Sequence, residues 1–120
     1  MYDRLDDVLV ERPAPSKAVV TFSGEHDLAA RDAVEQLLHS LVEENDLVVA
    51  DFSEATFIDS TMMHVLVTAD TAARQRGARF RLQLGTAAIV ERAFELSGLL
   101  QRLDSAYTRD EALADPPAEG

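Results

Sequence analysis

The chain has 120 residues, 47% hydrophobic and 28% charged, which is the composition of one folded domain with a core of its own. Its 11 basic and 22 acidic residues give a formal net charge of -11, which disfavours nucleic acid and anionic membrane surfaces as partners. The absence of cysteine excludes disulfides, thiol catalysis and thiolate metal sites.

The N-terminal half alternates between strand and helix patterns. Residues 8–10 and 18–22 are apolar runs on either side of Pro13-Ala14-Pro15-Ser16, which predicts a hairpin with a proline turn. Residues 28–44 have helical spacing of apolar side chains, and Asp27 stands where it would cap that helix. Residues 47–52 form a short apolar run that predicts a buried central strand.

The C-terminal half continues the alternation. Residues 62–75 read as a helix ended by Gly77, and residues 79–84 alternate in polarity, which predicts a strand with one wet face. Thr86 would cap a third helix that stops at Gly98. We expect a short last strand within residues 99–103, a helical turn at 110–114 and a frayed tail at 115–120.

This order favours an α/β fold: one domain over residues 1–114, with a mixed sheet of four to five strands and about four helices. The first seven residues are too acidic for a signal peptide, and no apolar run approaches the roughly 18 residues of a membrane span. We therefore expect a cytoplasmic protein that does not insert into membranes.

Two turns contain the chemically notable residues. Asp59-Ser60-Thr61 stands at the start of the second helix, where Asp59 or Ser60 could be a simple cap. Alternatively, Ser60 lies exposed at a positive helix end that would accommodate an added phosphate. The turn from Ser23 to Asp27 allows the same two interpretations: a tight turn on Gly24 with a capping Asp27, or an acidic group beside the Asp59 turn at one sheet edge.

Three segments give the chain a resemblance to a known family. They are Ser23-Gly24-Glu25-His26-Asp27, then Asp51-Phe52-Ser53 followed by Phe57-Ile58-Asp59-Ser60-Thr61, and finally Phe94-Glu95-Leu96-Ser97-Gly98-Leu99. In order and spacing they resemble the STAS domain of stand-alone bacterial anti-sigma factor antagonists. The resemblance covers about residues 5–113.

The resemblance implies a partner-switching protein and not an enzyme. Ser60 would be the phosphoacceptor of an anti-sigma factor with a serine kinase fold, and a serine phosphatase would reverse the modification. The unphosphorylated form would bind the anti-sigma factor and release the sigma factor. Around the phosphosite and the docking surface, the match places Gly24, Glu25, Asp27, Asp59, Thr61, Met62, Met63 and His64.

One part of the motif departs from the family. The family's loop continues with glycine, leucine and glycine, whereas this chain has Met62, Met63 and His64. Bulky side chains thus replace two glycines that would let a partner approach. Either this protein docks with a partner of a different shape, or the kinase-dependent switch has decayed; because the phosphoacceptor serine is present, we expect phosphorylation. We expect one methionine of the pair to face the core, and an exposed one would suit an adaptable protein contact.

Other functions are less well supported. Ser60, His64 and an aspartate could be written as a hydrolytic triad, but the sequence lacks a strained nucleophile elbow and oxyanion donors. The three histidines lack metal-ligand spacing, and no phosphate-binding glycine loop is present, so no metal or cofactor is expected. The alternative is an unphosphorylated STAS scaffold, or a regulatory subunit of a signalling assembly or membrane transporter.

Overall fold

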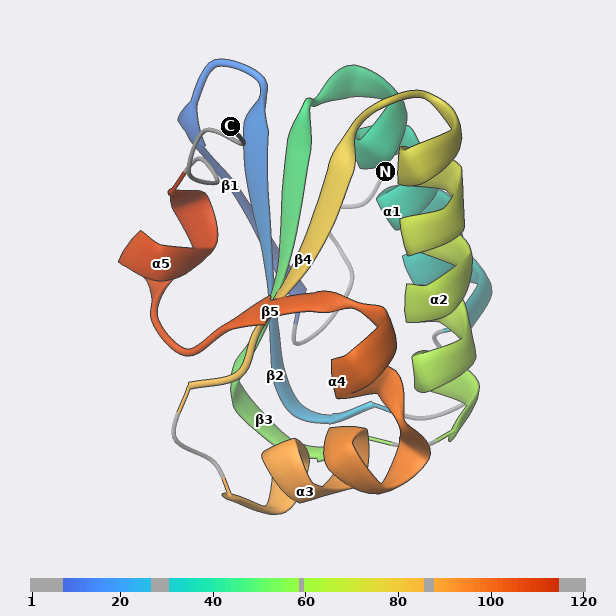
Figure 1. Ribbon diagram of the computed structural model, residues 1–120, viewed down its shortest axis with the longest axis vertical. Coiled ribbons are helices and arrows are strands. Elements are labelled where there is room, and N and C mark those ends of the chain that lie inside the picture. The colour runs from blue at the N-terminus through green and yellow to red at the C-terminus, as the bar shows by residue number, and fades with distance from the viewer. Residues whose placement is uncertain (1–7, 27–30, 59, 86–87, 115–120) are drawn as a thin grey trace.

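A five-stranded sheet with helices on both faces forms the body of the protein (Figure 1). The computed structural model describes residues 8–26, 31–58, 60–85 and 88–114. In chain order the elements are β1 (Val8–Ala14), β2 (Lys17–His26), α1 (Arg31–Glu44), β3 (Leu47–Ile58), α2 (Ser60–Gln75), β4 (Arg79–Gln83), α3 (Ala88–Ser97), α4 (Leu99–Arg102), β5 (Asp104–Ala106) and α5 (Arg109–Leu113).

The sheet is mixed, as the order of elements predicts. Its strands lie in the order β1-β2-β3-β4-β5, with β1 antiparallel to β2 and all other pairs parallel. The predicted hairpin is present, and its turn lies at Pro15 and Ser16, where Ser16 adopts a left-handed φ of 65°. Pro13 still belongs to β1, an edge strand, where a missing N–H is tolerated.

The prediction of a strand within residues 99–103 is wrong. Residues Leu99–Arg102 form the short helix α4, and the last strand is β5, one element further along. Gly98, at φ 82°, ends α3 and allows a new helical turn to start at once. Leu99 and Leu103, four residues apart, both turn into the core, a spacing that suits a helical turn.

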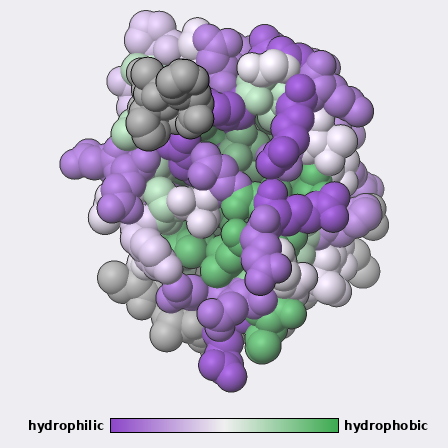
Figure 2. All heavy atoms as spheres, viewed as in Figure 1, coloured by the Kyte–Doolittle hydropathy of each residue, from purple (hydrophilic) through white to green (hydrophobic). Residues whose placement is uncertain are grey.

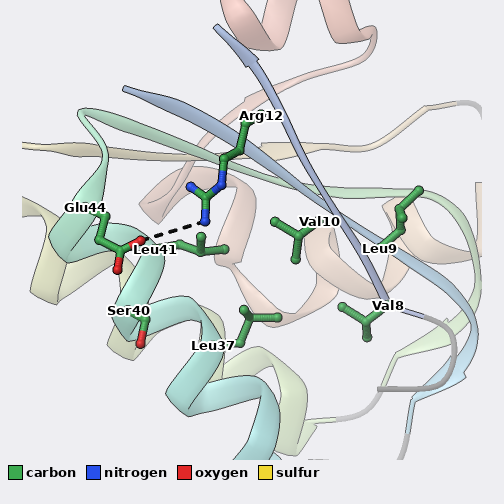
Figure 3. Close-up of a pocket in the computed structure, with 8 residues that line it drawn as sticks. All are labelled: Val8, Leu9, Val10, Arg12, Leu37, Ser40, Leu41 and Glu44. Carbon is green, nitrogen blue, oxygen red and sulfur yellow. Dashed lines mark ion pairs between the residues drawn. The ribbon is translucent and has the colours of Figure 1, made fainter. Parts of the chain in front are cut away.

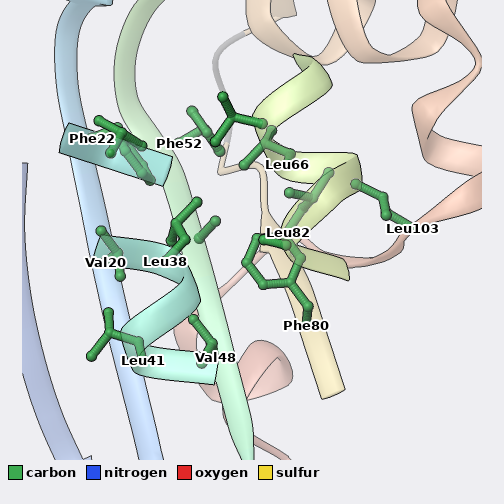
Figure 4. Packing of buried hydrophobic residues seen from close by; sticks show 14 of the residues in the cluster. Val20, Phe22, Leu38, Leu41, Val48, Phe52, Leu66, Phe80, Leu82 and Leu103 are labelled. Atoms are coloured by element: carbon green, nitrogen blue, oxygen red, sulfur yellow. The ribbon is translucent and has the colours of Figure 1, made fainter. Parts of the chain in front are cut away.

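The main core lies between the sheet and the helix pair α1 and α2 (Figures 1 and 4). The phenyl ring of Phe22 on β2 stacks on that of Phe52 on β3 at 4.8 Å between centroids. Phe94 of α3 meets Phe52 edge to face at 5.3 Å and so ties the third helix to the same core. Each such buried side chain contributes about 1.5–3 kcal/mol to folding.

The prediction that the fourth strand has one solvent-exposed face is also wrong. Arg81 and Gln83 are each only 6% exposed, because α5 covers this face of the sheet. The Arg81 Nε donates to the Asp104 carboxylate at 2.7 Å, and its Nη1 donates to the Ala112 and Ala114 carbonyls at 2.7 and 3.0 Å. Two cations therefore hold the C-terminal end of α5, since the Lys17 Nζ also donates to the Leu113 carbonyl at 2.8 Å.

The start of α5 is closed by a reciprocal cap. The Thr108 hydroxyl accepts from the Glu111 N–H at 3.2 Å, and the Glu111 carboxylate accepts from the Tyr107 N–H at 3.0 Å.

Figure 2 shows hydrophilic side chains over much of the face that carries β5 and α4, with hydrophobic ones gathered near its centre. No helix in the described part of the chain is long and apolar enough to cross a membrane.

Position 85 requires a glycine, because the backbone there lies close to Ser53 of β3. Its φ is 67°, and an added Cβ would lie 2.4 Å from the Ser53 Cβ and 2.8 Å from the Ser53 Cα. We expect Gly85→Ala to lower the free energy of unfolding by more than the roughly 1–2 kcal/mol of left-handed strain alone. Gly77→Ala is the matched control, because Gly77 has φ 79° and nothing within 4 Å of the added carbon. Equal losses in urea titrations of the two variants would contradict the contact with Ser53.

Arg81 is the main anchor of α5. We expect Arg81→Met to cost on the order of 2–3 kcal/mol, because the carbonyls at the end of α5 lose their donor. Hydrogen exchange should accelerate over residues 104–114 before it does so in β2 and β3. Arg92→Met, at an exposed position of α3, is the matched control. Unchanged exchange over residues 104–114 in Arg81→Met would contradict the anchoring role.

Candidate functional site

The adjacent ends of β2 and β3 bring together the two turns singled out in the sequence. In the parallel register, Gly24 pairs with Ala55, Glu25 with Phe57 and His26 with Ile58. The strand predicted for residues 47–52 thus continues to Ile58, and the two motifs run side by side toward α2 near the bottom of Figure 1. The register shifts between Thr21 and Ser23 and again between Gly24 and Glu25, so this part of the pair is irregular.

The helix α2 begins at Ser60. Ser60 is exposed, Thr61 is half-buried and His64 is exposed. Because residues four apart lie on the same side of a helix, Ser60 and His64 present their side chains on one solvent-facing surface. An accessible hydroxyl at this end of a 16-residue helix suits the addition of a phosphate.

The two methionines lie on the inner side of α2. Met62 is 2% exposed and belongs to the main core, and Met63 is half-buried and packs against it. At the first of the two glycine positions, the side chain of Met62 points inward. Of the two departures from the glycine pattern, only His64 changes the outer surface.

Several predicted site residues can be placed only in part. Asp27 and Asp59 lie outside the described residues, as do the predicted helix caps at Asp27, Asp59 and Thr86. Gly24 and Glu25 are placed through the backbone of β2 alone. The structure therefore brings the backbone of the first motif beside the second motif, with Ser60 and His64 exposed next to it.

A buried carboxylate behind the site belongs to the second motif but was not among the predicted site residues. Asp51 on β3 is 3% exposed, and its carboxylate accepts from the Ser53 N–H at 2.8 Å and from the Thr21 hydroxyl at 3.4 Å. Arg109 of α5 donates to the same carboxylate at 3.4 Å and pairs with Glu11 of β1 at 3.0 Å. These bonds fix β3 where its register with β2 shifts. The Asp-x-Ser spacing, which allows an aspartate to bond the backbone two residues on, was the available signal.

The cation in this cluster stays charged. Burial lowers the pKa of Arg109, but the carboxylates of Glu11 and Asp51 more than offset it, so its pKa lies above the ordinary value. The cluster therefore links β1, β3 and α5 through the charged guanidinium of Arg109. The described residues contain no group of three or more side chains suited to hold a metal ion.

A separate open groove of about 600 Å³ lies between β1 and α1 (Figure 3). It is lined by apolar side chains, with Arg12 and Glu44 forming an ion pair of 3.8 Å at one end. Its lining residues all belong to these two elements, so the groove does not include Ser60 or His64. They are Val8, Leu9, Val10, Arg12, Leu37, Ser40, Leu41 and Glu44.

Comparison with solved structures identifies proteins of the same architecture. An anti-sigma factor antagonist from Mycobacterium paratuberculosis is 27% identical, with a TM-score of 0.76 over 88% of this chain and 89% of that chain. The anti-sigma factor antagonist SpoIIAA, in its unphosphorylated form, is 19% identical, with a TM-score of 0.74 over 88% and 92%. The Bacillus protein SpoIIAA in its phosphorylated form is 18% identical, with a TM-score of 0.69 over 88% and 96%.

A transporter domain shares the fold as well. The STAS domain of a SulP transporter from Vibrio cholerae is 16% identical, with a TM-score of 0.64 over 86% of this chain and 82% of that chain. No curated protein sequence matches this chain significantly.

The family model completes the comparison. The model of the STAS domain matches residues 8–112, which span every strand and all but the last residue of the final helix. The mixed five-stranded sheet and its helices agree with that assignment. The chain belongs to the STAS domain family.

Proposed function

We propose that this protein is an anti-sigma factor antagonist that binds a kinase-type anti-sigma factor and is switched off by phosphorylation of Ser60. The observation that carries the proposal is an exposed serine as the first residue of α2, beside the paired ends of β2 and β3. The likeness to antagonists, one of them solved in both phosphorylation states, supports the same role.

Electrostatics suggests how the switch would act. A phosphate adds about 1.5 to 2 negative charges to a chain whose formal net charge is already -11. The positive end of α2 would stabilise it by on the order of 1 kcal/mol, so the fold itself is expected to change little. The added charge instead alters the docking surface, where like-charge repulsion and bulk would release the partner.

The core position of Met62 supports this use of the surface. Since Met62 lies inside, the exposed part of the first turn of α2 remains small and polar at Ser60. A partner can therefore reach the hydroxyl without displacing the methionine. His64, one turn along, is the bulky group that such a partner would meet.

Regulation of a transporter is the second candidate function. The likeness to the SulP transporter domain supports it, with a TM-score of 0.64 against 0.69–0.76 for the antagonists. In that role Ser60 need not be modified. Phosphorylation of Ser60 therefore separates the two candidates.

The phosphorylation test uses intact-mass spectrometry after incubation with the candidate anti-sigma kinase and ATP. We expect one added phosphate, about 80 Da, on the wild type and none on Ser60→Ala. Thr61→Val is the matched control and should still gain one phosphate, because Thr61 is half-buried. If a kinase that is active on its own substrate modifies none of these proteins, the proposed pairing fails and the transporter role gains support.

A further inference from the structure

The exposed side of α2 places an ionisable group beside Ser60. Ser60 and His64 are both exposed, whereas Met62, Val65 and Leu66 face the core. On a helix the Cβ atoms of residues i and i+4 lie roughly 6 Å apart, which a phosphate and an imidazole can bridge. The Thr68 hydroxyl donates to the His64 carbonyl at 3.0 Å inside the helix.

His64 is not committed to another ion pair within the described residues, where the salt bridges of α2 involve Asp70 and Arg74. Apart from Arg74, nearly three turns further on, it is the only basic residue of α2. A negative charge added at Ser60 would therefore find its nearest cationic group on this helix at His64.

We infer that His64 is the counter-ion of a phosphate on Ser60 and makes the charge of the phosphorylated site depend on pH. This inference rests on the proposed function. Histidine ordinarily titrates near pH 6.5 and phosphoserine near pH 6, so the two groups change charge in one window and their titrations are coupled. Below that window the imidazolium offsets part of the phosphate charge, and above it the phosphate presents its full charge to a partner.

The remaining charged groups at this end of the molecule are mostly acidic. On β2, on the N-terminal half of α1 and on α3 they are Glu25, His26, Arg31, Asp32, Glu35, Glu91, Arg92 and Glu95, and α1 packs against α2. In the sequence, Asp59 directly precedes Ser60 and Asp27 directly follows His26. On β4, which also packs against α2, Arg81 is bound to Asp104 and α5, and Arg79 pairs in register with Leu47 at the opposite end of the sheet. His26, whose backbone pairs with Ile58, is the rival counter-ion.

The test requires no kinase. The full chain is made with phosphoserine incorporated directly at position 60, and the phosphate is titrated by ³¹P NMR at low salt in the presence of His64 and in the His64→Gln variant. We expect the phosphate pKa to be lower when His64 is present, by on the order of 0.3 pH unit or more, because the imidazolium favours the dianion. The difference should shrink at high salt.

Two histidine variants make the test specific. His39→Gln is the matched control, since His39 lies in the C-terminal half of α1. The Arg76 Nη1 donates to the Val42 and Asn45 carbonyls at 2.9 Å, so this half of α1 lies at the far end of α2 from Ser60. Equal phosphate pKa values with and without His64 overturn the inference, as does a shift that is lost only in His26→Gln. Because phosphoserine is incorporated without a kinase, failure of a kinase to act bears on the proposed function alone.

Discussion

The parallel pairing of β2 with β3 is the contact on which the candidate site depends. Both strands are buried at the centre of the sheet, and Phe22 and Phe52 stack across them. Since parallel neighbours end at the same edge, the end of β2 at His26 lies beside the end of β3 at Ile58, two residues before Ser60. The position of Ser60 is therefore a consequence of the core.

Different kinds of interaction hold the helices on the two faces of the sheet. Under α1 and α2 the contacts are apolar, and they are strong because aromatic and aliphatic side chains are removed from water. Under α5 the apolar cluster is small, and buried or half-buried cations bind helix carbonyls and carboxylates. Asp51 connects this second layer to β3. The contacts on the α5 side of the sheet therefore help to fix the end of β3 that leads to Ser60.

The pattern of strands and helices could be predicted because apolar spacing is a local property. The hairpin, the helices before Gly77 and Gly98, and the buried strand from Leu47 all follow from it. The alternation of residues 79–84 was misleading, because a short helix some 25 residues later buries Arg81 and Gln83. Such long-range cover has no local signal, although Thr108-x-x-Glu111 marks where that helix starts.

The sequence could name the residues of the candidate site but not their orientation. The resemblance of the motifs indicates Ser60, but the sequence alone could not say which of Met62, Met63 and His64 faces a partner. That depends on how α2 is rotated about its axis, which the packing of Met62, Val65, Leu66 and Ala69 decides. With Met62 inside, the unusual feature of this surface is reduced to one histidine beside one serine.

The proposed switch is tested by calorimetric measurement of the affinity of a kinase-type anti-sigma factor for this protein with and without a phosphate on Ser60. We expect that the unphosphorylated protein binds and that the phosphoprotein, with the same circular dichroism spectrum, binds at least about 100-fold more weakly, or roughly 2.7 kcal/mol. Equal affinities for two equally folded forms would contradict it.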